Sequence, residues 1–316
     1  MVVYDPEQLL VQAKQSNRVA LAKLLSIVER GGSRARELAK LTWGHGGDTY
    51  VVGITGAPGA GKSTLTDGLI SQVRSRSREV AIIAVDPTSP FSGGAILGDR
   101  VRMQEHATDS GVFIRSMATR GHLGGLALAV PDAVRVLSAV KFPYVFIETV
   151  GVGQVEVEVI GAADTVTVVL TPGWGDAVQV NKAGLMEVAD LFIINKADRA
   201  GARETRRDIE LMLEMSTFEG WIPPIIETVA TEGKGMGEVF EAIESHREYL
   251  ERSGMGQKRR KSRILEELTR IVRAEANRKV DQMMSDPWFS PKIAKLINGE
   301  IDPYSLASEL LKVEGG

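Results

Sequence analysis

A glycine-rich loop between an apolar run and a helical stretch constrains the fold of this chain more than any other feature of its sequence. Residues 51–55 are predicted as a strand and residues 65–73 as a helix. The residues between them fit the pattern G-x-x-x-x-G-K-[ST]. They read Gly56, Ala57, Pro58, Gly59, Ala60, Gly61, Lys62, Ser63 and Thr64. A strand, this loop and a helix in that order indicate a phosphate-binding loop.

The residue types in this loop suit the binding of a nucleotide phosphate. Glycines let backbone N–H groups turn inward around the β-phosphate, and the helix N-terminus adds its partial positive charge. We expect Lys62 to place a full charge between the β- and γ-phosphate oxygens and the Ser63 hydroxyl to ligate Mg²⁺. The alternative is a glycine-rich turn with an incidental lysine, and the strand and helix on either side count against it.

Short apolar runs alternate with polar or helical stretches through the middle of the chain. They lie at residues 50–55, 80–85, 112–115, 144–147, 165–170, 191–194 and 225–228. Continuous apolar strands that alternate with helices indicate a mostly parallel sheet with both faces covered. We therefore expect an α/β P-loop NTPase fold with a mostly parallel central sheet, and ligands at the carboxyl ends of its strands.

Helical periodicity dominates both ends of the chain. Residues 6–41 are predicted as a helical hairpin interrupted at Gly31 and Gly32. After about residue 245 the strands stop, and an amphipathic helix is predicted from the apolar stripe Ile264, Leu265, Leu268, Ile271 and Val272. The expected organisation is an N-terminal helical arm at 1–44, a GTP-binding G domain at 45–245 and a C-terminal helical dimerisation region at 246–316.

The composition argues against several classes of function. A formal net charge of -3 is not what a broad nucleic-acid surface requires, and no run approaches the ~18 apolar residues of a membrane span. The chain has 0 Cys, which excludes disulfides, thiolate metal sites and cysteine nucleophiles. Its first residues lack the basic and apolar parts of a secretory signal, so we expect a cytoplasmic protein without nucleic-acid or membrane partners.

A second motif selects the base of the nucleotide. Asn195, Lys196, Ala197 and Asp198 follow the apolar run at 191–194, which places Asp198 on a strand-end loop beside the phosphate loop. A carboxylate there can accept hydrogen bonds from N1–H and the exocyclic amine of guanine, whereas adenine has no proton on N1. The motif therefore predicts GTP rather than ATP. The loop expected to close over the guanine contains Val229, Ala230 and Thr231.

Two carboxylates end predicted strands at the same edge of the sheet. Asp86 follows the run at 80–85, and Glu148 follows the run at 144–147. Mg²⁺ prefers oxygen ligands and the attacking water needs a positioned acceptor, so both residues have plausible roles. The alternative is that they are solvated acids of surface loops. Glu148 stands where D-x-x-G motifs have Asp, and no Gln directly follows Gly151, so we expect slow hydrolysis by the free protein.

These strings together resemble the MeaB/ArgK family of SIMIBI-class GTPases, which is related to the methylmalonic aciduria type A protein. The resemblance covers nearly the whole chain and includes residues 56–64, 86–90, 93–100, 120–125, 148–154 and 195–198. It implies a homodimeric GTPase that binds GTP or GDP with Mg²⁺ and acts as a chaperone for an adenosylcobalamin-dependent acyl-CoA mutase. That partner is expected to be methylmalonyl-CoA mutase or a close relative, whose cofactor loading the GTPase gates and which it protects. The GTPase is not expected to bind cobalamin itself.

The resemblance also implies roles for single residues. Asp99 belongs to switch I with a Mg²⁺-linked role, and Glu148 and Gln154 belong to switch II. Asp176 and Lys182, in an additional switch at 172–182, are expected to couple the nucleotide state to the mutase. The expected catalytic set is Lys62, Asp86, Asp99, Glu148 and Gln154, and the expected metal set is Ser63, Asp86, Asp99 and Glu148.

Three other functions remain open from the sequence. A nickel-type metallochaperone GTPase would share the fold class, but the chain has no Cys and no clustered His. An ArgK-type kinase for a transport protein would need a phosphoacceptor site, and none is evident in the sequence. The third is a scaffold that binds GTP without meaningful turnover.

Overall fold

The computed structural model describes residues 5–45, 49–86, 106, 108–118, 125–149, 161–173, 188–218 and 220–312. The chain divides into two compact units, Met1–Arg263 and Ile264–Gly316. The boundary falls inside a helix, 18 residues after position 245, where the sequence analysis ends the G domain. The sequence-based division at 44 and 245 stays a proposal.

The first unit is built on a seven-stranded sheet with the order β3-β2-β4-β1-β5-β6-β7. The strands are β1 (Tyr50–Gly56), β2 (Val80–Asp86), β3 (Val112–Ala118), β4 (Tyr144–Thr149), β5 (Thr165–Leu170), β6 (Leu191–Asn195) and β7 (Ile225–Thr228). Every pair of neighbouring strands is parallel. The α/β fold with a parallel sheet is thus confirmed, and the carboxyl ends of all strands meet at one edge.

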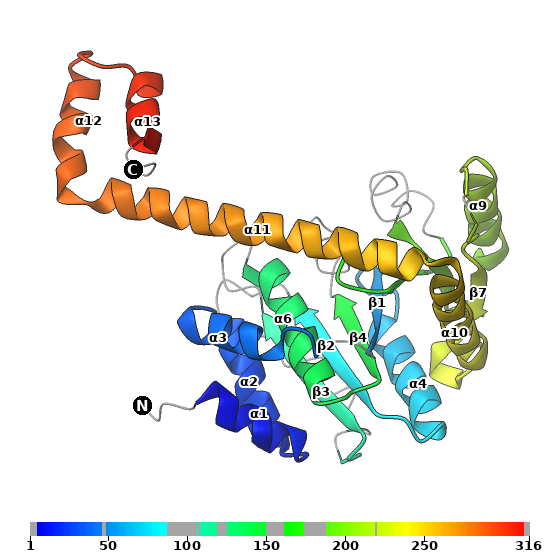
Figure 1. Cartoon of the computed structure of the whole chain (residues 1–316). Helices are drawn as coiled ribbons and strands as arrows, with labels where there is room; N and C mark the ends of the chain where they lie inside the picture. Colours follow the sequence, from blue (N-terminus) through cyan, green and yellow to red (C-terminus); the bar gives the residue numbers. More distant parts are fainter. Residues whose placement is uncertain are drawn as a thin grey trace. The chain divides into compact units, whose positions relative to one another are not determined.

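Helices cover both faces of this sheet (Figure 1). The helices of the first unit are α1 (Pro6–Lys14), α2 (Arg18–Arg30), α3 (Ser33–Thr42), α4 (Lys62–Ser75), α6 (Gly125–Ala139), α9 (Ala202–Glu214), the short η2 (Ala230–Glu232), α10 (Met236–Ser253) and the start of α11 (Met255–Ser285). One apolar core unites the sheet with α1, α2, α3, α6 and α9, and the other unites it with α4 and α10.

Side chains of each strand alternate between the two cores. Along β1, Val51 lies in the first core, whereas Val52 and Ile54 lie in the second. Because both faces are covered, every residue of β1 and β4 is buried. This explains the continuous apolar runs of the sequence, since a strand with one face in water would alternate apolar and polar residues.

The N-terminal segment forms three helices rather than the expected hairpin of two. The extra break lies at Ser16, which has a φ of 65°, and Asn17 caps the next helix by accepting from the Ala20 N–H at 3.0 Å. Leu24, Leu25 and Leu38 are fully buried in the first core. Full burial of each such side chain stabilises the fold by roughly 1.5–3 kcal/mol, so these helices are part of the core of the first unit.

The second unit is helical throughout its described part. It contains the rest of α11, the short η3 (Pro287–Phe289), α12 (Ser290–Ile297) and α13 (Pro303–Lys312). The predicted amphipathic helix lies within α11, and its apolar stripe at Ile264, Leu265, Leu268, Ile271 and Val272 is 42 to 57% exposed. Among the described residues, no helix is both long enough and apolar enough to cross a membrane.

Candidate nucleotide-binding site

The phosphate loop connects the carboxyl end of β1 to the N-terminus of α4. Two of its glycines have no room for a side chain. A Cβ on Gly56, whose φ is 145°, would lie 2.2 Å from the Val169 carbonyl oxygen of β5. A Cβ on Gly61, whose φ is 88°, would lie 2.3 Å from the Asn195 amide nitrogen. The glycines of the motif thus allow both a left-handed backbone and close packing against the ends of β5 and β6.

Lys62 is the first residue of α4 and is 6% exposed. Its ammonium donates to the carbonyl oxygens of Gly56 at 2.7 Å and Ala57 at 3.0 Å, so the charge lies within the loop. A phosphate oxygen carries negative charge and is a stronger acceptor for an ammonium than a neutral carbonyl oxygen, so a bound phosphate would compete for these bonds. The loop therefore presents a cation and a helix N-terminus to an anion.

Ser63 and Glu148 bring two oxygen ligands together at the same edge. The Ser63 hydroxyl donates to Glu148 Oε1 at 2.5 Å, and Glu148 is 2% exposed. Mg²⁺ in nucleotide sites takes one or two carboxylates together with phosphate oxygens and water. The hydroxyl and the carboxylate fit such an ion. No group of three or more His, Cys, Asp or Glu suited to a metal occurs among the described residues.

Asn195 links two loops at this edge. Its Nδ2 donates to the Ala60 carbonyl of the phosphate loop at 2.9 Å. Its Oδ1 accepts from the Thr228 hydroxyl at 3.1 Å and from the Ala230 N–H at 3.2 Å. The side chain is 2% exposed and bonded on both sides, so its position is fixed. The last residue of β6 thus joins the phosphate loop to the loop after β7.

The neighbouring residues complete this arrangement. Lys196, with a φ of 58°, donates from Nζ to the Gly59 carbonyl at 2.7 Å. Asp198 is exposed two residues later. The Ala197 N–H donates to the Thr228 carbonyl at 3.0 Å, so the loops after β6 and β7 are close together. The carboxylate that the sequence assigns to guanine is thus open to a ligand beside the phosphate loop.

The structure therefore brings the three predicted loops together, at residues 56–63, 195–198 and 229–231. Five other predicted residues have side chains outside the described part of the chain. Asp86 ends β2, but its side chain lies outside the described residues. Outside them altogether lie Asp99, Gln154, Asp176 and Lys182.

Sequence reasoning missed two contacts that support this site. Thr228, the last residue of β7, donates from its hydroxyl to the side-chain Oδ1 of Asn195, and the Thr149 hydroxyl of β4 donates to the Thr55 hydroxyl of β1 at 3.1 Å. A polar residue at the end of an apolar strand is a usable signal for such a contact. Which loop the residue joins depends on the strand order, which the sequence does not specify.

Comparison with known proteins identifies relatives along most of the chain. The family described as "Methylmalonyl Co-A mutase-associated GTPase MeaB" matches residues 21–285. A relative from Pyrococcus abyssi, named as a candidate GTPase, is 50% identical over 310 residues, which cover 97% of this chain and 96% of the relative. The GTPase ArgK of Escherichia coli is 35% identical over 271 residues, which cover 83% of this chain and 82% of the relative.

Two further matches extend the comparison. The mitochondrial methylmalonic aciduria type A homolog of Caenorhabditis elegans is 29% identical, over 98% of this chain and 84% of the relative. Among solved structures, the crystal structure of an LAO/AO transport system kinase superposes with a TM-score of 0.72, covers 100% of both chains and has 24% sequence identity. At that identity the likeness supports the fold alone.

Proposed function

Because the chain belongs to the MeaB family of GTPases, we propose that its GTP cycle is a switch that acts on an adenosylcobalamin-dependent acyl-CoA mutase. In this proposal the switch gates cofactor loading of the mutase and protects it, and the GTPase binds no cobalamin itself. The observation that carries the proposal is the junction at Asn195, where the phosphate loop meets the two loops expected to hold guanine. The family description and the name of the C. elegans relative support the choice of partner.

The chain is a GTPase, and its phosphate loop has the parts that phosphate binding needs. Lys62 exchanges its bonds to Gly56 and Ala57 for bonds to the β- and γ-phosphate oxygens. Backbone N–H groups of the loop and of the first turn of α4 bind the remaining oxygens. Phosphoryl transfer depends mainly on positioning and on charge stabilisation, and this loop supplies both.

Ser63 and Glu148 are the described residues that would hold Mg²⁺. The ion, when bound, neutralises charge that develops on the phosphate oxygens. The Ser63 hydroxyl, which donates to Glu148 Oε1, would be one ligand, and Glu148 would be the other, held in place because it lies inside β4. Asp86, Asp99 and Gln154 complete the proposed catalytic set.

Guanine is selected by Asp198, while Asn195 and Lys196 hold the neighbouring phosphate loop. Val229, Ala230 and Thr231 close over the base in this proposal. A site built around a carboxylate rejects a base that cannot donate to it, because the charge would lose its solvent without gaining a partner. The preference for GTP over ATP therefore follows from one side chain.

The proposal also assigns residues that contact the partner. Asp176 and Lys182 couple the nucleotide state to the mutase in this proposal. The exposed apolar stripe of α11 supports a homodimer, because an unpaired stripe of this kind on a helix is stabilised by a second copy. The tail that contains α12 and α13 belongs to the same dimerisation region.

The alternatives receive less support from the described residues. Nickel insertion would call for a metal-binding cluster, and the described residues contain no group of three or more suitable side chains. A kinase that phosphorylates a transport protein remains the second candidate, since the superposed crystal structure carries that name. The likeness is one of fold, so it does not favour kinase activity over hydrolysis.

The proposal is tested by measuring GTP hydrolysis by the full chain alone and with a purified adenosylcobalamin-dependent acyl-CoA mutase. We expect the mutase to raise the rate, and Lys62→Ala to abolish nucleotide binding and stimulation while the fold is retained. Lys258→Ala, a change of an exposed lysine on α11, serves as the matched control. Nickel binding and phosphate transfer from GTP to other proteins are measured alongside. No stimulation by such a mutase, together with phosphate transfer, would overturn the proposal in favour of the kinase.

A further inference from the structure

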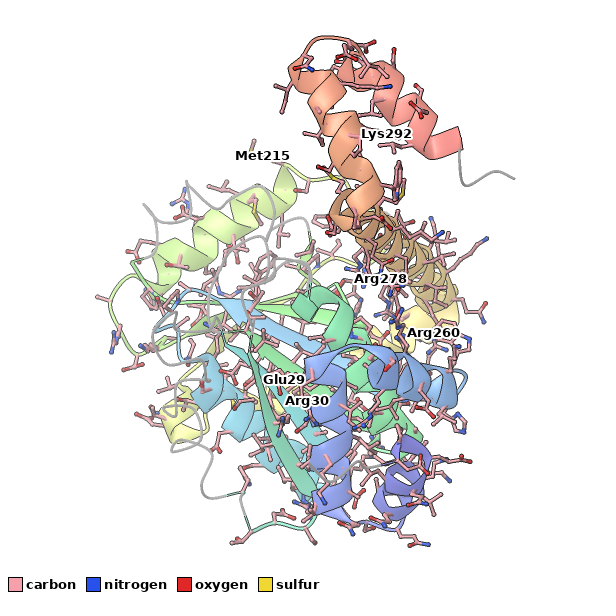
Figure 2. The ribbon with its side chains drawn as sticks, turned by 90° about the vertical axis from the view of Figure 1, so that its left-hand side faces the viewer. Glu29, Arg30, Met215, Arg260, Arg278 and Lys292 are labelled. Carbon is pink, nitrogen blue, oxygen red and sulfur yellow. The ribbon has the colours of Figure 1, made fainter. Side chains whose placement is uncertain are left out.

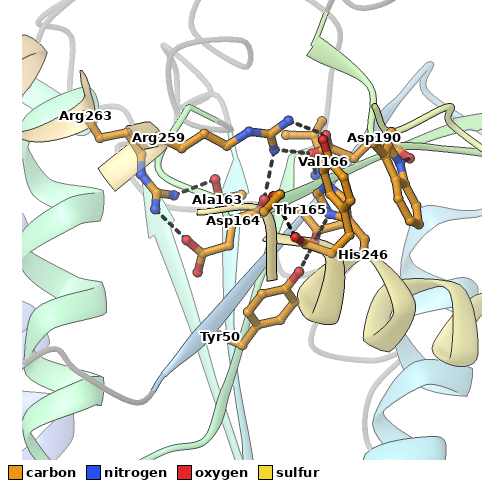
Figure 3. Close-up of polar contacts among 12 residues, drawn as sticks. Tyr50, Ala163, Asp164, Thr165, Val166, Asp190, His246, Arg259 and Arg263 are labelled. Atoms are coloured by element: carbon orange, nitrogen blue, oxygen red, sulfur yellow. Dashed lines mark hydrogen bonds and ion pairs between the residues drawn. The ribbon is translucent and has the colours of Figure 1, made fainter. Parts of the chain in front are cut away.

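A network of polar side chains lies at the amino ends of β5 and β6 and takes no part in the proposed nucleotide site. Parallel strands all begin at one edge of a sheet and end at the other, so this network lies at the edge opposite the phosphate loop. Its members are drawn in Figure 3: Tyr50, Asp164, Thr165, Asp190, His246, Arg259 and Arg263.

Two aspartates fasten the beginnings of neighbouring strands to one another. Asp164 accepts from the Val51 N–H at 3.0 Å and donates its own N–H to the Val51 carbonyl at 2.7 Å. Asp190 makes the same pair of contacts with Val166, at 2.9 and 2.8 Å. Asp190 is 4% exposed, and a carboxylate at such depth requires a positively charged partner.

The positively charged partners of Asp164 and Asp190 both come from the first turns of α11. Arg259 forms a two-pronged pair with the Asp190 carboxylate at 2.8 and 3.0 Å and also donates to the Asp164 carbonyl at 3.2 Å. Arg263, one helical turn later, pairs with the Asp164 carboxylate and donates to the carbonyls of Ala162 and Ala163. Two arginines on one helix face thus bond the amino ends of both β5 and β6. We call these contacts of Arg259 and Arg263 the arginine latch.

The groups around the latch leave it little freedom. The His246 side chain is fully buried and bonds the Thr165 hydroxyl at 2.8 Å, and the Tyr50 hydroxyl bonds the same oxygen. Trp221 donates from its indole N–H to the Asp190 carbonyl at 2.8 Å. These buried polar groups are bonded to one another, so a displacement of the start of β5 or β6 is shared by the whole set.

The order of the chain gives the latch its significance. The segment that ends at Asp164 begins after Glu148 in β4, and the segment that ends at Asp190 begins after β5. Both segments therefore start at the nucleotide edge and finish at the latch. Gln154 belongs to the first of them, and Asp176 and Lys182 to the second. The helix that supplies both arginines continues as one helix to Ser285, in the second unit.

We propose that the arginine latch transmits the nucleotide state of the first unit to α11, by holding the ends of both segments to the base of that helix. The proposal rests on the proposed switch function and adds an intramolecular path to it. A nucleotide that moves either segment changes the geometry at Asp164 or Asp190, and the paired arginines pass this change to the helix that carries the apolar stripe. Coupling of this kind requires a structural element whose equilibrium both sites influence. In this proposal that element is α11.

The test is amide hydrogen exchange along α11 in the full chain, with GDP and with a non-hydrolysable GTP analogue. In the wild type we expect amides of residues 264–285 to exchange at rates that differ about 5-fold or more between the two nucleotides. In the double variant Arg259→Lys and Arg263→Lys the difference should disappear, because lysine keeps the charge but loses the two-pronged geometry. The affinity for both nucleotides should stay within about 2-fold, since the latch does not touch the phosphate loop.

Arg260→Lys is the matched control, because Arg260 lies exposed on the same helix between the two latch residues (Figure 2). It should preserve the wild-type difference. If the double variant does not fold, Arg263→Gln alone gives the same comparison, since it leaves the Arg259 pair with Asp190 in place. Equal exchange with both nucleotides in the wild type, or a difference that survives in the latch variants, would overturn the proposal. No mutase is present in these measurements, so their failure is distinct from a failure of the proposed function.

Discussion

Single residues at the nucleotide edge act through more than one loop. Asn195 is the clearest case, because its amide bonds the phosphate loop on one side and the loop after β7 on the other. Asp198 in the same motif is exposed, whereas Asn195 is buried between the two loops. The motif thus divides into a residue that builds the site and a residue that reads the base.

This division predicts the effect of Asp198→Asn. The variant should lose roughly 10- to 100-fold in GTP affinity, because a hydrogen bond to a charged group contributes about 1.5–3 kcal/mol. Its weak affinity for ATP should change little, and its thermal stability should stay that of the wild type. Titration with both nucleotides checks this, with Asp208→Asn on the exposed face of α9 as the control. An unchanged ratio of GTP to ATP affinity would contradict the assignment of Asp198.

His246 predicts a dependence of stability on pH. Burial lowers the pKa of His246 from 6.5 to about 4, despite the opposing charge of Asp190. Protonation therefore favours the unfolded chain, and the contribution of His246 to stability is present above pH 6.5 and is lost as the pH falls towards 4. For this group the loss between pH 7 and pH 5 is about 2 kcal/mol.

Urea denaturation of the wild type and of His246→Gln at several pH values between 7 and 5 measures this contribution. The variant should be less stable than the wild type at pH 7, because it loses the buried ring that bonds the Thr165 hydroxyl. It should lose less stability on acidification, because glutamine cannot be protonated. The other histidines and the carboxylates contribute equally to both proteins, so their contributions cancel when the two slopes of unfolding free energy against pH are compared. Parallel slopes would show that His246 is not the group responsible.

The sequence predicts the roles of single site residues better than it predicts which residues contact one another. The roles expected of Lys62 and Asp198 need only a motif in its strand and helix context, because a phosphate loop has one known geometry. The contact of Ser63 with Glu148 joins residues 85 positions apart, and the contact of Asn195 with Ala60 joins residues 135 positions apart. Such distances in sequence are closed by the strand order, which local patterns do not encode.

Among the elements, the start of α4 is the most tightly constrained. Gly61 combines a φ of 88° with close contact to Asn195, so Gly61→Ala adds both backbone strain and a clash. Gly254, between α10 and α11, has a φ of 71° and open space around it, so Gly254→Ala adds strain alone. The strain of a left-handed residue costs roughly 1–2 kcal/mol.

We therefore expect both variants to lower the thermal midpoint, and Gly61→Ala alone to weaken GTP binding, by about 10-fold or more, because the displaced amide releases Ala60. Thermal denaturation and nucleotide titration of the two variants check this. Equal loss of GTP affinity in both would mean that the contact with Asn195 does not position the phosphate loop.

The elements themselves were largely predictable. Each strand contains an apolar run, and the expected positions of all seven agree with those observed to within a few residues. The N-terminal break at Ser16 was missed, because a serine with a positive φ follows from no simple pattern. The arginine latch was missed as well, since Arg259 and Arg263 lie in a basic stretch that resembles a solvated helix start.

The two units of the chain differ in how many apolar side chains they bury. The first unit contains both apolar cores, whereas the described part of the second has few buried apolar side chains, among them Phe289 and Leu306. Other large apolar side chains are exposed, such as Met215 after α9 in the first unit (Figure 2) and Tyr304 in the second.

A chain that ends at Arg263 is expected to fold, to bind GTP and to be monomeric, because it keeps both cores and both latch arginines but lacks the apolar stripe. The full chain is expected to be a dimer, and Leu268→Lys in the full chain should weaken it. Light scattering after size-exclusion chromatography distinguishes these states. A dimeric truncated chain would place the dimer interface in the first unit instead.

If the nucleotide acts as a switch on an acyl-CoA mutase, its state must change the affinity for that mutase, and equilibrium binding measures this change. The affinity of the full chain for an adenosylcobalamin-dependent mutase is measured with GDP and with a non-hydrolysable GTP analogue. A switch requires different affinities in the two states, and we expect a ratio of about 5-fold or more, with the mutase shifting nucleotide affinity by the same factor. Equal affinity for the mutase in both states would contradict the account.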